Sequence, residues 1–119
     1  MDRMGGMELT VALCALKEAE NLKLLLPRLK KQLEQIGCSY EIRVIDGQKS
    51  QDDTEQVCRE QGVFYHNQEE PHFGGAIRTA FRLAEGEKLA MFDADGSHDP
   101  EELPAMYRAM EDGVDLVIS

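Results

Sequence analysis

Apolar runs and helical repeats alternate along the first part of the chain. Residues 9–15 form a mostly apolar run without helical period, which is typical of a strand buried on both faces. From Ala19 to Ile36, apolar residues recur at spacings of three and four, which predicts an amphipathic helix ending at Gly37. Pro27 lies inside this repeat and predicts a kink or an interrupted first turn.

The same alternation continues to the last residue. Strands that alternate with helices indicate a mostly parallel sheet covered on both faces, which is a doubly wound α/β fold. We expect a loose start at 1–7 and one domain over 8–119, and we interpret the chain as a longer domain truncated after its fifth strand. The further strands are predicted at 40–45, 63–65, 88–92 and 114–118, and the further helices from Asp52 or Asp53 as a cap to Arg59, after Gly75 to Ala84, and from Pro100, capped by Asp99, to about Glu111.

The charge balance disfavours nucleic acid as a partner. Thirteen Lys and Arg residues against 23 Asp and Glu residues give a formal net charge of −10. This charge repels phosphate backbones, and an aromatic content of 6% without tryptophan supplies little surface for base stacking. An anionic ligand would therefore need an accompanying cation or a local basic pocket.

The cysteines and the apolar runs bear on location and assembly. Cys14, Cys38 and Cys58 are widely spaced and form no CxxC pair, so we expect reduced thiols, two of them in strands or the core of a cytoplasmic protein. No run approaches eighteen apolar residues, so we expect no membrane span, although peripheral association stays open. An uncovered last strand could pair with a second copy in a homodimer.

Carboxylates follow three of the predicted strands. Ligands of open α/β sheets bind at the carboxyl ends of strands, and Glu18, Asp46 and the pair Asp93 and Asp95 all fall there. Two aspartates one residue apart after a buried strand can converge on one hard divalent ion, Mg²⁺ or Mn²⁺. Such an ion would offset the repulsion between an acidic protein and a diphosphate, and it would stabilise a departing nucleoside diphosphate.

A second candidate site is the glycine pair at 74–75, just before a predicted helix. Glycine lets a backbone approach a ligand closely, and a helix amino terminus favours anions. Arg78 lies about one turn into this helix and could reach a phosphate, but a tight loop with a surface arginine fits equally well. His66, His72 and His98 lack metal-ligand spacing, and only His98 lies close to the acidic pair.

These motifs together resemble family 2 glycosyltransferases, within them the dolichyl-phosphate and polyprenyl-phosphate mannosyl- and glucosyltransferase-like group. The resemblance covers nearly the whole chain from residue 11 onward and is strongest over 91–104, which contains the DxD segment and the Pro-Glu helix that follows. The segments 18–21, 44–46, 50–54 and 75–80 are similar to the family's first loop, second-strand signature and glycine-rich helix start.

The resemblance implies a GT-A fold and a nucleoside diphosphate sugar as donor, with GDP and UDP both open, and a lipid phosphate as a candidate acceptor. It implies that Asp95 is the chief metal ligand and that Asp93 contacts the nucleotide or sugar and completes the acidic pair. The general base for inverting transfer would come from a later part of the domain, beyond this chain. The implied nucleotide-sugar-binding residues are Ala15, Leu16, Glu18, Asp46, Gly75, Arg78, Asp93, Ala94 and Asp95.

Departures from the family pattern leave alternatives open. The first loop keeps only Glu18 of the family's Pro-x-Tyr-Asn-Glu, so the stacking tyrosine is lost, and Lys49 is an extra residue in the second loop. A non-catalytic nucleotide-binding module or relic is therefore the main alternative to a donor-binding enzyme domain. A haloacid-dehalogenase-type phosphatase and a response-regulator receiver fit less well, because their acids and lysine would have to lie elsewhere in the chain.

Overall fold

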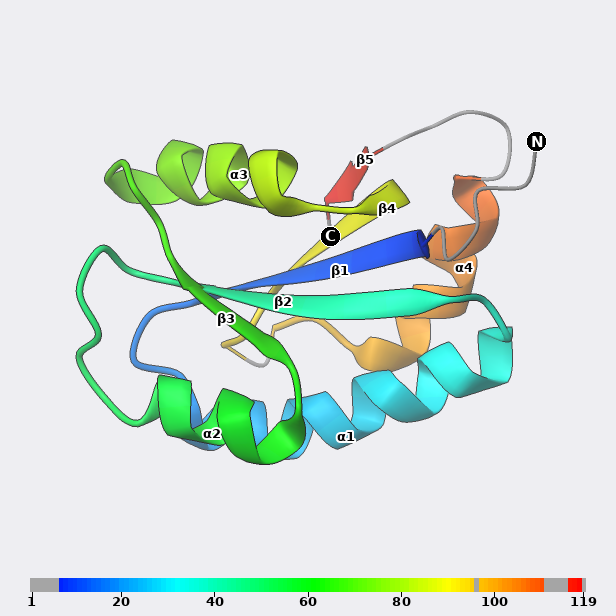
Figure 1. Cartoon of the computed structure of the whole chain (residues 1–119). Coiled ribbons are helices and arrows are strands. Elements are labelled where there is room, and N and C mark those ends of the chain that lie inside the picture. Colours follow the sequence, from blue (N-terminus) through cyan, green and yellow to red (C-terminus); the bar gives the residue numbers. More distant parts are fainter. Residues whose placement is uncertain (1–6, 96, 111–115, 119) are drawn as a thin grey trace.

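The computed structural model describes residues 7–95, 97–110 and 116–118. Within these residues, five parallel strands form one sheet in the order β3-β2-β1-β4-β5 (Figure 1). The elements are β1 (Met7–Ala15), α1 (Ala19–Ile36), β2 (Tyr40–Asp46), α2 (Thr54–Gln61), β3 (Phe64–Asn67), α3 (His72–Leu83), β4 (Gly86–Asp93), the 3₁₀ turn η1 (Pro100–Glu102), α4 (Leu103–Ala109) and β5 (Leu116–Ile118).

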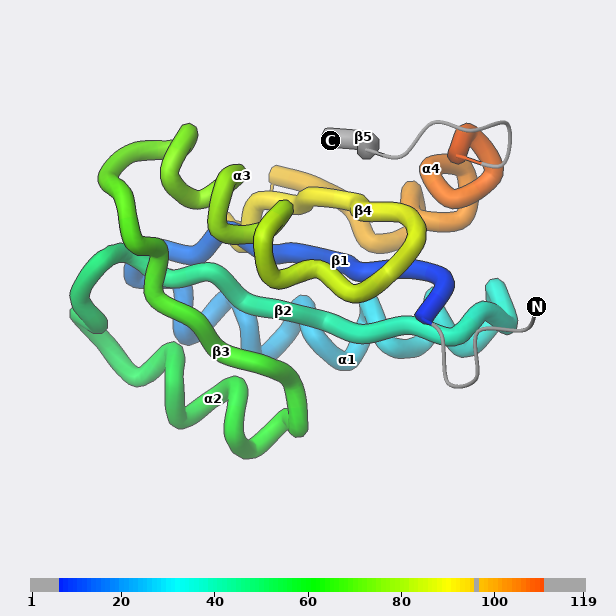
Figure 2. The backbone as a smooth tube through the Cα atoms, turned by 45° about the horizontal axis from the view of Figure 1, so that its top comes forward, coloured from blue at the N-terminus to red at the C-terminus, as the bar shows by residue number. Residues whose placement is uncertain are grey.

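Helices cover both faces of the sheet, which confirms the predicted doubly wound α/β fold. Helices α1, α2 and α4 lie on one face and α3 lies on the other (Figures 1 and 2). The larger core lies under α1, where leucines of the helix pack on alternate residues of β1, β2 and β4. The smaller core joins Ala76 and Ala80 of α3 to Ala12, Ile45 and Met91 of the sheet.

The strand order reverses between β1 and β4. The chain adds β2 and β3 on one side of β1 and then returns to place β4 on the other side. Cys14 lies opposite Asp93 in this pair, and the Ala94 N–H donates to the Cys14 carbonyl at 3.1 Å. The loops that leave β1 and β4 therefore diverge from neighbouring points, which is where open α/β sheets bind ligands.

Helix α1 has the bounds that its apolar repeat predicts. Gly37 ends it with φ 82°, and its N–H donates to the Leu33 carbonyl at 3.2 Å. Of the two outcomes expected at Pro27, the interruption is wrong, because the helix runs unbroken through that residue, and the kink stays a prediction. Pro27 and Lys23 are both exposed, so the Lys23 carbonyl that loses its intrahelical donor lies on the solvent side.

Two predicted boundaries need correction. The strand expected at 63–65 lies at Phe64–Asn67, because the Val63 N–H donates to the Cys58 carbonyl and completes the end of α2. Helix α3 begins at His72, so the glycine pair lies within its first turns and not in the preceding loop. A Cβ atom at Gly75 would lie 2.0 Å from the Glu70 carbonyl oxygen, so this close backbone approach requires glycine.

Other boundaries agree with expectation to within two residues or lie outside the described residues. Asp99 caps the turn at Pro100 by accepting from the Glu101 N–H at 3.0 Å, as predicted. Helix α4 ends at Ala109, and the predicted end of this helix and the predicted start of the last strand fall on residues 111–115, which are not described. All three cysteines are free, with Cys14 in β1 and Cys58 in the core. No helix in the described ranges is long and apolar enough to cross a bilayer.

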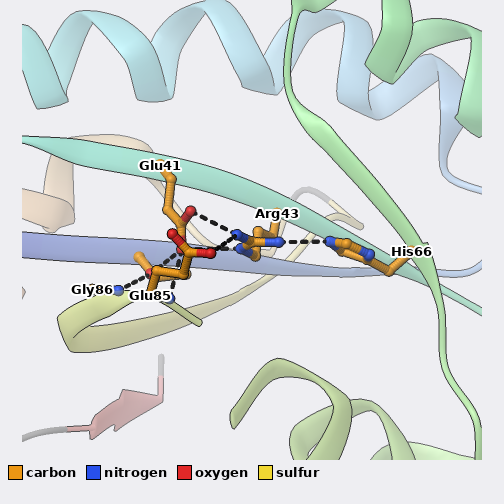
Figure 3. A network of polar contacts seen from close by, with 6 residues as sticks. Glu41, Arg43, His66, Glu85 and Gly86 are labelled. Carbon is orange, nitrogen blue, oxygen red and sulfur yellow. Dashed lines mark hydrogen bonds and ion pairs between the residues drawn. The ribbon is translucent and has the colours of Figure 1, made fainter. Parts of the chain in front are cut away.

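A polar network is buried on the α3 side of the sheet (Figure 3). The side chains of Glu41 and Arg43 are 4% and 8% exposed, and two hydrogen bonds of 2.9 Å join them. Glu41 Oε2 also accepts from the Thr10 hydroxyl at 2.6 Å and from the Glu85 N–H at 2.9 Å. Arg43 Nη1 lies 3.0 Å from His66 Nε2. This network has the partners that buried charges require.

Candidate functional site

The loops at the carboxyl ends of β1 to β4 surround a cleft of about 680 Å³. Its lining comes from four separate loops and the start of α3, which is the arrangement that the strand order predicts. The lining residues are Cys14, Ala15, Leu16 and Glu18 at and after the end of β1; Ile45, Gly47, Gln48, Lys49 and Gln51 at and after the end of β2; Gln68, Pro71, His72, Phe73 and Ala76 between β3 and the first turns of α3; and Asp93, Ala94 and Asp95 at and after the end of β4.

Most of the residues named from the sequence lie in this cleft. The end of β1 and the loop after it contribute Ala15, Leu16 and Glu18, and the end of β4 and the loop after it contribute the whole segment 93–95. Asp46, Gly75 and Arg78 are absent from the lining. The structure thus brings the first loop and the acidic pair together, and it places the other three residues in supporting positions.

Both residues of the acidic pair line the cleft. The Asp93 side chain is 45% exposed. Asp95 is exposed, and its Oδ1 accepts from the Ser97 hydroxyl at 2.6 Å and from the Ser97 N–H at 2.9 Å. These two hydrogen bonds, the hydroxyl first, lower the pKa of Asp95 below its ordinary value. Asp95 is therefore ionised at neutral pH, with Oδ2 turned to no partner among the described residues.

Hard oxygen donors of this kind suit Mg²⁺ or Mn²⁺. Within the described ranges, no group of three or more His, Cys, Asp or Glu residues could hold a metal ion. A divalent ion between Asp93 and Asp95 would thus take its remaining ligands from water or from a bound phosphate. Mg²⁺ commonly does so in sites that bind phosphates through one or two carboxylates. The donor set therefore fits the metal that the sequence predicts.

His98 supports the backbone at the start of the acidic segment. Its Nδ1 accepts from the Asp93 N–H at 2.9 Å, and its ring packs edge-on against Phe92 with centroids 5.7 Å apart. Because Nδ1 is the acceptor, the neutral ring carries its proton on Nε2. Sequence reasoning placed His98 close to the acidic pair, and the structure confirms this, because His98 Nδ1 holds the Asp93 backbone and Nε2 lies 3.9 Å from Asp93 Oδ2.

Cys14 lies in the cleft beside Asp93 but is not a nucleophile. Burial, followed by the neighbouring Asp93 carboxylate, raises the pKa of the Cys14 thiol to about 12. The thiol therefore stays protonated at neutral pH, and Cys14 serves as part of the cleft wall.

Asp46 does not line the cleft, but its carboxylate holds the loop that does. The residue is buried, its Oδ1 accepts from the Gly47 N–H at 2.7 Å, and its Oδ2 accepts from the Tyr65 hydroxyl at 2.7 Å. Asn67 Nδ2 donates to the Gly47 carbonyl at 2.8 Å and so holds the same turn. Both Asp46 oxygens thus fix the start of the loop after β2, and direct contact with a ligand stays a prediction for this residue.

Arg78 pairs with Glu70 outside the cleft. The Arg78 side chain is 65% exposed, and its Nε donates to the Glu70 carboxylate. Gly75 allows the Glu70 backbone to pass close to α3, as described above. In this arrangement the glycine-rich helix start shapes the loop before α3. The predicted contact between Arg78 and a phosphate remains untested.

Asp52 is a positioning residue whose role sequence reasoning recognised only in part. Its carboxylate accepts from the Thr54 N–H at 3.1 Å and the Thr54 hydroxyl at 2.6 Å, and also from the Ala19 N–H at 3.1 Å. Burial raises the pKa of Asp52, but the bonds from Thr54 and Ala19 outweigh it and the pKa falls below its ordinary value. One carboxylate therefore joins the starts of α1 and α2, whose preceding loops both line the cleft.

Comparisons with known proteins give a consistent picture. Residues 10–119 match the family described as Glycosyl transferase family 2. An uncharacterized glycosyltransferase of Mycobacterium tuberculosis is 32% identical over 114 residues, which are 96% of this chain and 49% of that protein. A dolichol-phosphate mannosyltransferase of Pyrococcus furiosus is 31% identical over 117 residues, covering 94% of this chain and 32% of that protein. The chain thus spans about half or less of the length of the curated relatives it matches.

Solved structures show the same fold. The crystal structure of glucosyl-3-phosphoglycerate synthase from Mycobacterium tuberculosis in complex with Mn²⁺, UDP and phosphoglyceric acid aligns with a TM-score of 0.70 and 23% identity, covering 84% of this chain and 37% of that chain. The same enzyme has been solved in complex with Mg²⁺ and UDP. At this level of identity, the likeness concerns the arrangement of the elements.

Proposed function

We propose that the chain binds a nucleoside diphosphate sugar through a divalent metal. The chain belongs to glycosyl transferase family 2, because residues 10–119 match the model of that family. The binding site is the cleft at the carboxyl ends of the strands, and the fold is GT-A, as the likeness to glucosyl-3-phosphoglycerate synthase indicates. In a protein of the relatives' length, this part would hold the donor for inverting transfer of the sugar to an acceptor.

One observation carries the proposal. Asp93 and Asp95 lie in the cleft at the point where the strand order reverses, and one Asp95 carboxylate oxygen has no partner among the described residues. Mg²⁺ or Mn²⁺ held there would supply Lewis-acid stabilisation to the diphosphate. Asp95 is the chief metal ligand in this proposal, and Asp93 is the second carboxylate of the site.

The chain's other residues position the donor. The first loop, with Ala15, Leu16 and Glu18, forms the wall nearest the acidic pair, and the Glu18 carboxylate is fixed by the Asn21 side-chain amide at 2.7 Å. Asp46 holds the turn that enters the opposite wall. Gly75 and Arg78 belong to the proposed nucleotide-sugar site through the loop that they shape.

The acceptor and the transfer step are proposed for a protein of the relatives' length. The Pyrococcus relative is named for dolichol phosphate, and a Proteus mirabilis relative for undecaprenyl phosphate. We therefore propose a polyprenyl phosphate as acceptor, reached by a cytoplasmic protein bound peripherally to the membrane. We expect the 119-residue chain alone to bind donor and to transfer sugar poorly, with the general base in the part of the relatives that this chain does not span.

A non-catalytic nucleotide-binding module is the second candidate. The observation that favours it is Leu16, which stands in the first loop where the family resemblance leads one to expect tyrosine, and which is 57% exposed. Sugar transfer by a longer version of the protein, with polyprenyl phosphate present, separates the two candidates.

Donor binding is tested by calorimetry with UDP, GDP and their sugar conjugates, in Mn²⁺ or Mg²⁺ and in EDTA. Asp95→Asn should weaken binding in metal at least tenfold, to the level seen in EDTA. Asp53→Asn is the matched control, because it removes the same charge from an exposed residue outside the cleft. Binding that is equally strong in EDTA and in Asp95→Asn would refute the metal-dependent donor site.

A further inference from the structure

The character of the cleft lining changes along the sheet edge. The acids Asp93, Asp95 and Glu18 follow β4 and β1, whereas side-chain amides and a lysine follow β2 and β3. With neighbouring strands about 4.8 Å apart, β2 and β3 lie about 10 and 14 Å from β4. A nucleotide whose diphosphate lies at the acidic pair therefore has its base beside the loops that follow β2 and β3.

Gln48 presents a hydrogen-bond acceptor to this end of the cleft. Its Nε2 donates to the Glu69 carbonyl at 2.8 Å, which fixes the orientation of the amide. Its Oε1 has no hydrogen-bond partner in the described part of the chain. Gln48 lines the cleft, so this oxygen is available to accept from a bound ligand.

Gln68 presents a second acceptor for the same reason. Its Nε2 donates to the Glu70 carbonyl at 2.6 Å and to the His72 carbonyl at 2.8 Å, so both amide hydrogens are used. An amide in this orientation cannot donate to a ligand and can only accept through Oε1. The loop before α3 needs these two bonds, and the acceptor role of Gln68 is thereby built into the fold.

Lys49 supplies a donor from the same loop as Gln48. It lines the cleft, and the structure gives its ammonium group no ion pair or hydrogen bond with any described residue. Gln51 also lines the cleft without a partner among the described residues, but its amide is free to turn either way. Gln51 therefore does not favour one base over another, whereas Gln48, Gln68 and Lys49 form a set of two acceptors and one donor.

We propose that this set recognises guanine, so that the donor is a GDP-sugar and not a UDP-sugar. The inference rests on the proposed function and names the base for that site. Guanine presents the O6 acceptor beside two adjacent donors, N1–H and the N2 amino group, and these complement Lys49 and the two glutamine oxygens. Uracil has one N–H group between two carbonyls, so one glutamine oxygen would face a carbonyl. A polar site that is left unpaired in this way discriminates strongly between ligands.

Two apolar side chains suit the faces of a flat base at the same site. Leu16, in the loop after β1, and Phe73, in the first turn of α3, line the cleft and are 57% and 52% exposed. An aromatic ring stacks on any base, so Phe73 adds affinity without choosing guanine. The chain contains no tryptophan, so Phe73→Trp introduces a single fluorescent reporter at this wall. GDP should quench its emission in the presence of Mg²⁺, and inorganic pyrophosphate should not.

The experiment is calorimetry of the whole chain with GDP, IDP, UDP and inorganic pyrophosphate, all in Mg²⁺. IDP keeps O6 and N1–H of guanine but lacks the N2 amino group, so it isolates one of the two donors. We expect GDP to bind at least tenfold more tightly than UDP, with IDP between them. Gln48→Met should reduce the ratio of GDP to UDP affinity severalfold and leave pyrophosphate binding unchanged, while Gln51→Met, the matched control, should keep the ratio.

Each result decides the matter. UDP binding as tightly as GDP or more tightly, with metal dependence intact, would overturn the guanine inference and leave the donor site standing. An unchanged ratio in Gln48→Met would also overturn it. Failure of every nucleotide to bind the folded chain in metal would overturn the proposed function and this inference together.

Discussion

The Glu41–Arg43 network and the Asp93–Asp95 pair are both groups of charged side chains at the sheet. They differ in whether their carboxylate oxygens have hydrogen-bond partners within the protein. In the network, Glu41 Oε2 accepts three hydrogen bonds and Arg43 contacts Glu41, His66 and, at 3.7 Å, Glu85. No buried side-chain nitrogen or oxygen among the described residues lacks a partner. In the acidic pair, by contrast, Asp95 is exposed and has one carboxylate oxygen without a partner in those residues.

This difference separates charges that hold the fold from charges that can hold a ligand. Removing one member of a saturated buried group leaves its partners uncompensated, which costs stability. Removing an exposed carboxylate leaves no buried group unpaired, so the loss falls on whatever the carboxylate binds. The comparison predicts that stability and binding respond to different substitutions.

The largest effect on stability is expected from Glu41→Ala. The change leaves the Arg43 guanidinium, the Thr10 hydroxyl and the Glu85 N–H without their shared acceptor. Breaking a buried pair in this way costs about 3–5 kcal/mol of the free energy of unfolding. Urea unfolding of the variant and the parent chain measures the difference.

Glu55→Ala is the control for this prediction. Glu55 pairs with Arg59 on the exposed side of α2, and such a pair contributes about 0–1 kcal/mol. The double variant Glu41→Leu with Arg43→Met should recover much of the lost stability, because it removes both charges together. A Glu41→Ala variant no less stable than Glu55→Ala would show that the network does not hold the fold.

The network also marks the limit of what the sequence predicts. The alternation of strands and helices, the bounds of α1 and the place of the acidic pair at the sheet edge all follow from local patterns, and the structure confirms them. The burial of Glu41 and Arg43 within β2 depends on Thr10 and His66, which lie on other strands. No local pattern contains that pairing.

The candidate site shows the same limit at three residues. The bond from the Tyr65 hydroxyl on β3 to the Asp46 carboxylate could not be predicted from the sequence, and contact between Asp46 and a ligand stays a prediction. Arg78 pairs with Glu70 because Gly75 lets the preceding loop pass against α3. These contacts join segments that only folding brings together. The place of the acidic pair could be predicted, because the pair follows the end of one buried strand.

A smaller loss of stability is expected from Asp52→Ala, which removes the carboxylate shared by α1 and α2. The Ala19 and Thr54 N–H groups both lose their acceptor, and loss of a helix cap costs about 0.5–2 kcal/mol. Asp53→Ala is the matched control, because Asp53 precedes the same helix and its side chain makes no capping bond. The two variants are compared by urea unfolding, and equal stability would contradict the bridging role.

The pH dependence of stability should be smaller and should come from His66. Burial, followed by the neighbouring Arg43 guanidinium, lowers the pKa of His66 below its ordinary 6.5. The unfolded chain therefore binds the proton more readily than the folded chain. The stability that neutral His66 contributes is full above pH 6.5 and is lost as the pH falls through the lower pKa of the folded state.

Unfolding free energies on either side of that window check this prediction. The parent chain should lose more stability on acidification than His66→Gln, whose amide oxygen can still accept from Arg43 Nη1 but does not titrate there. The difference between the two chains removes the contribution of the carboxylates, which titrate in both. Parallel pH profiles would show that His66 does not contribute to the acid sensitivity of the fold.

The smallest effect on stability is expected from Asp95→Asn, and it completes the comparison. Asparagine keeps the Oδ1 acceptor that receives both Ser97 bonds, so the turn after β4 stays closed. Asp95 is exposed, so the change buries no unpaired group, and the midpoint of urea unfolding in EDTA should not move. Adding Mn²⁺ and nucleotide should raise the midpoint of the parent chain but not of the variant, since a ligand stabilises only the state that binds it. A variant that unfolds earlier than the parent in EDTA would place Asp95 with Glu41 among the charges that hold the fold, and the distinction between the two clusters would fail.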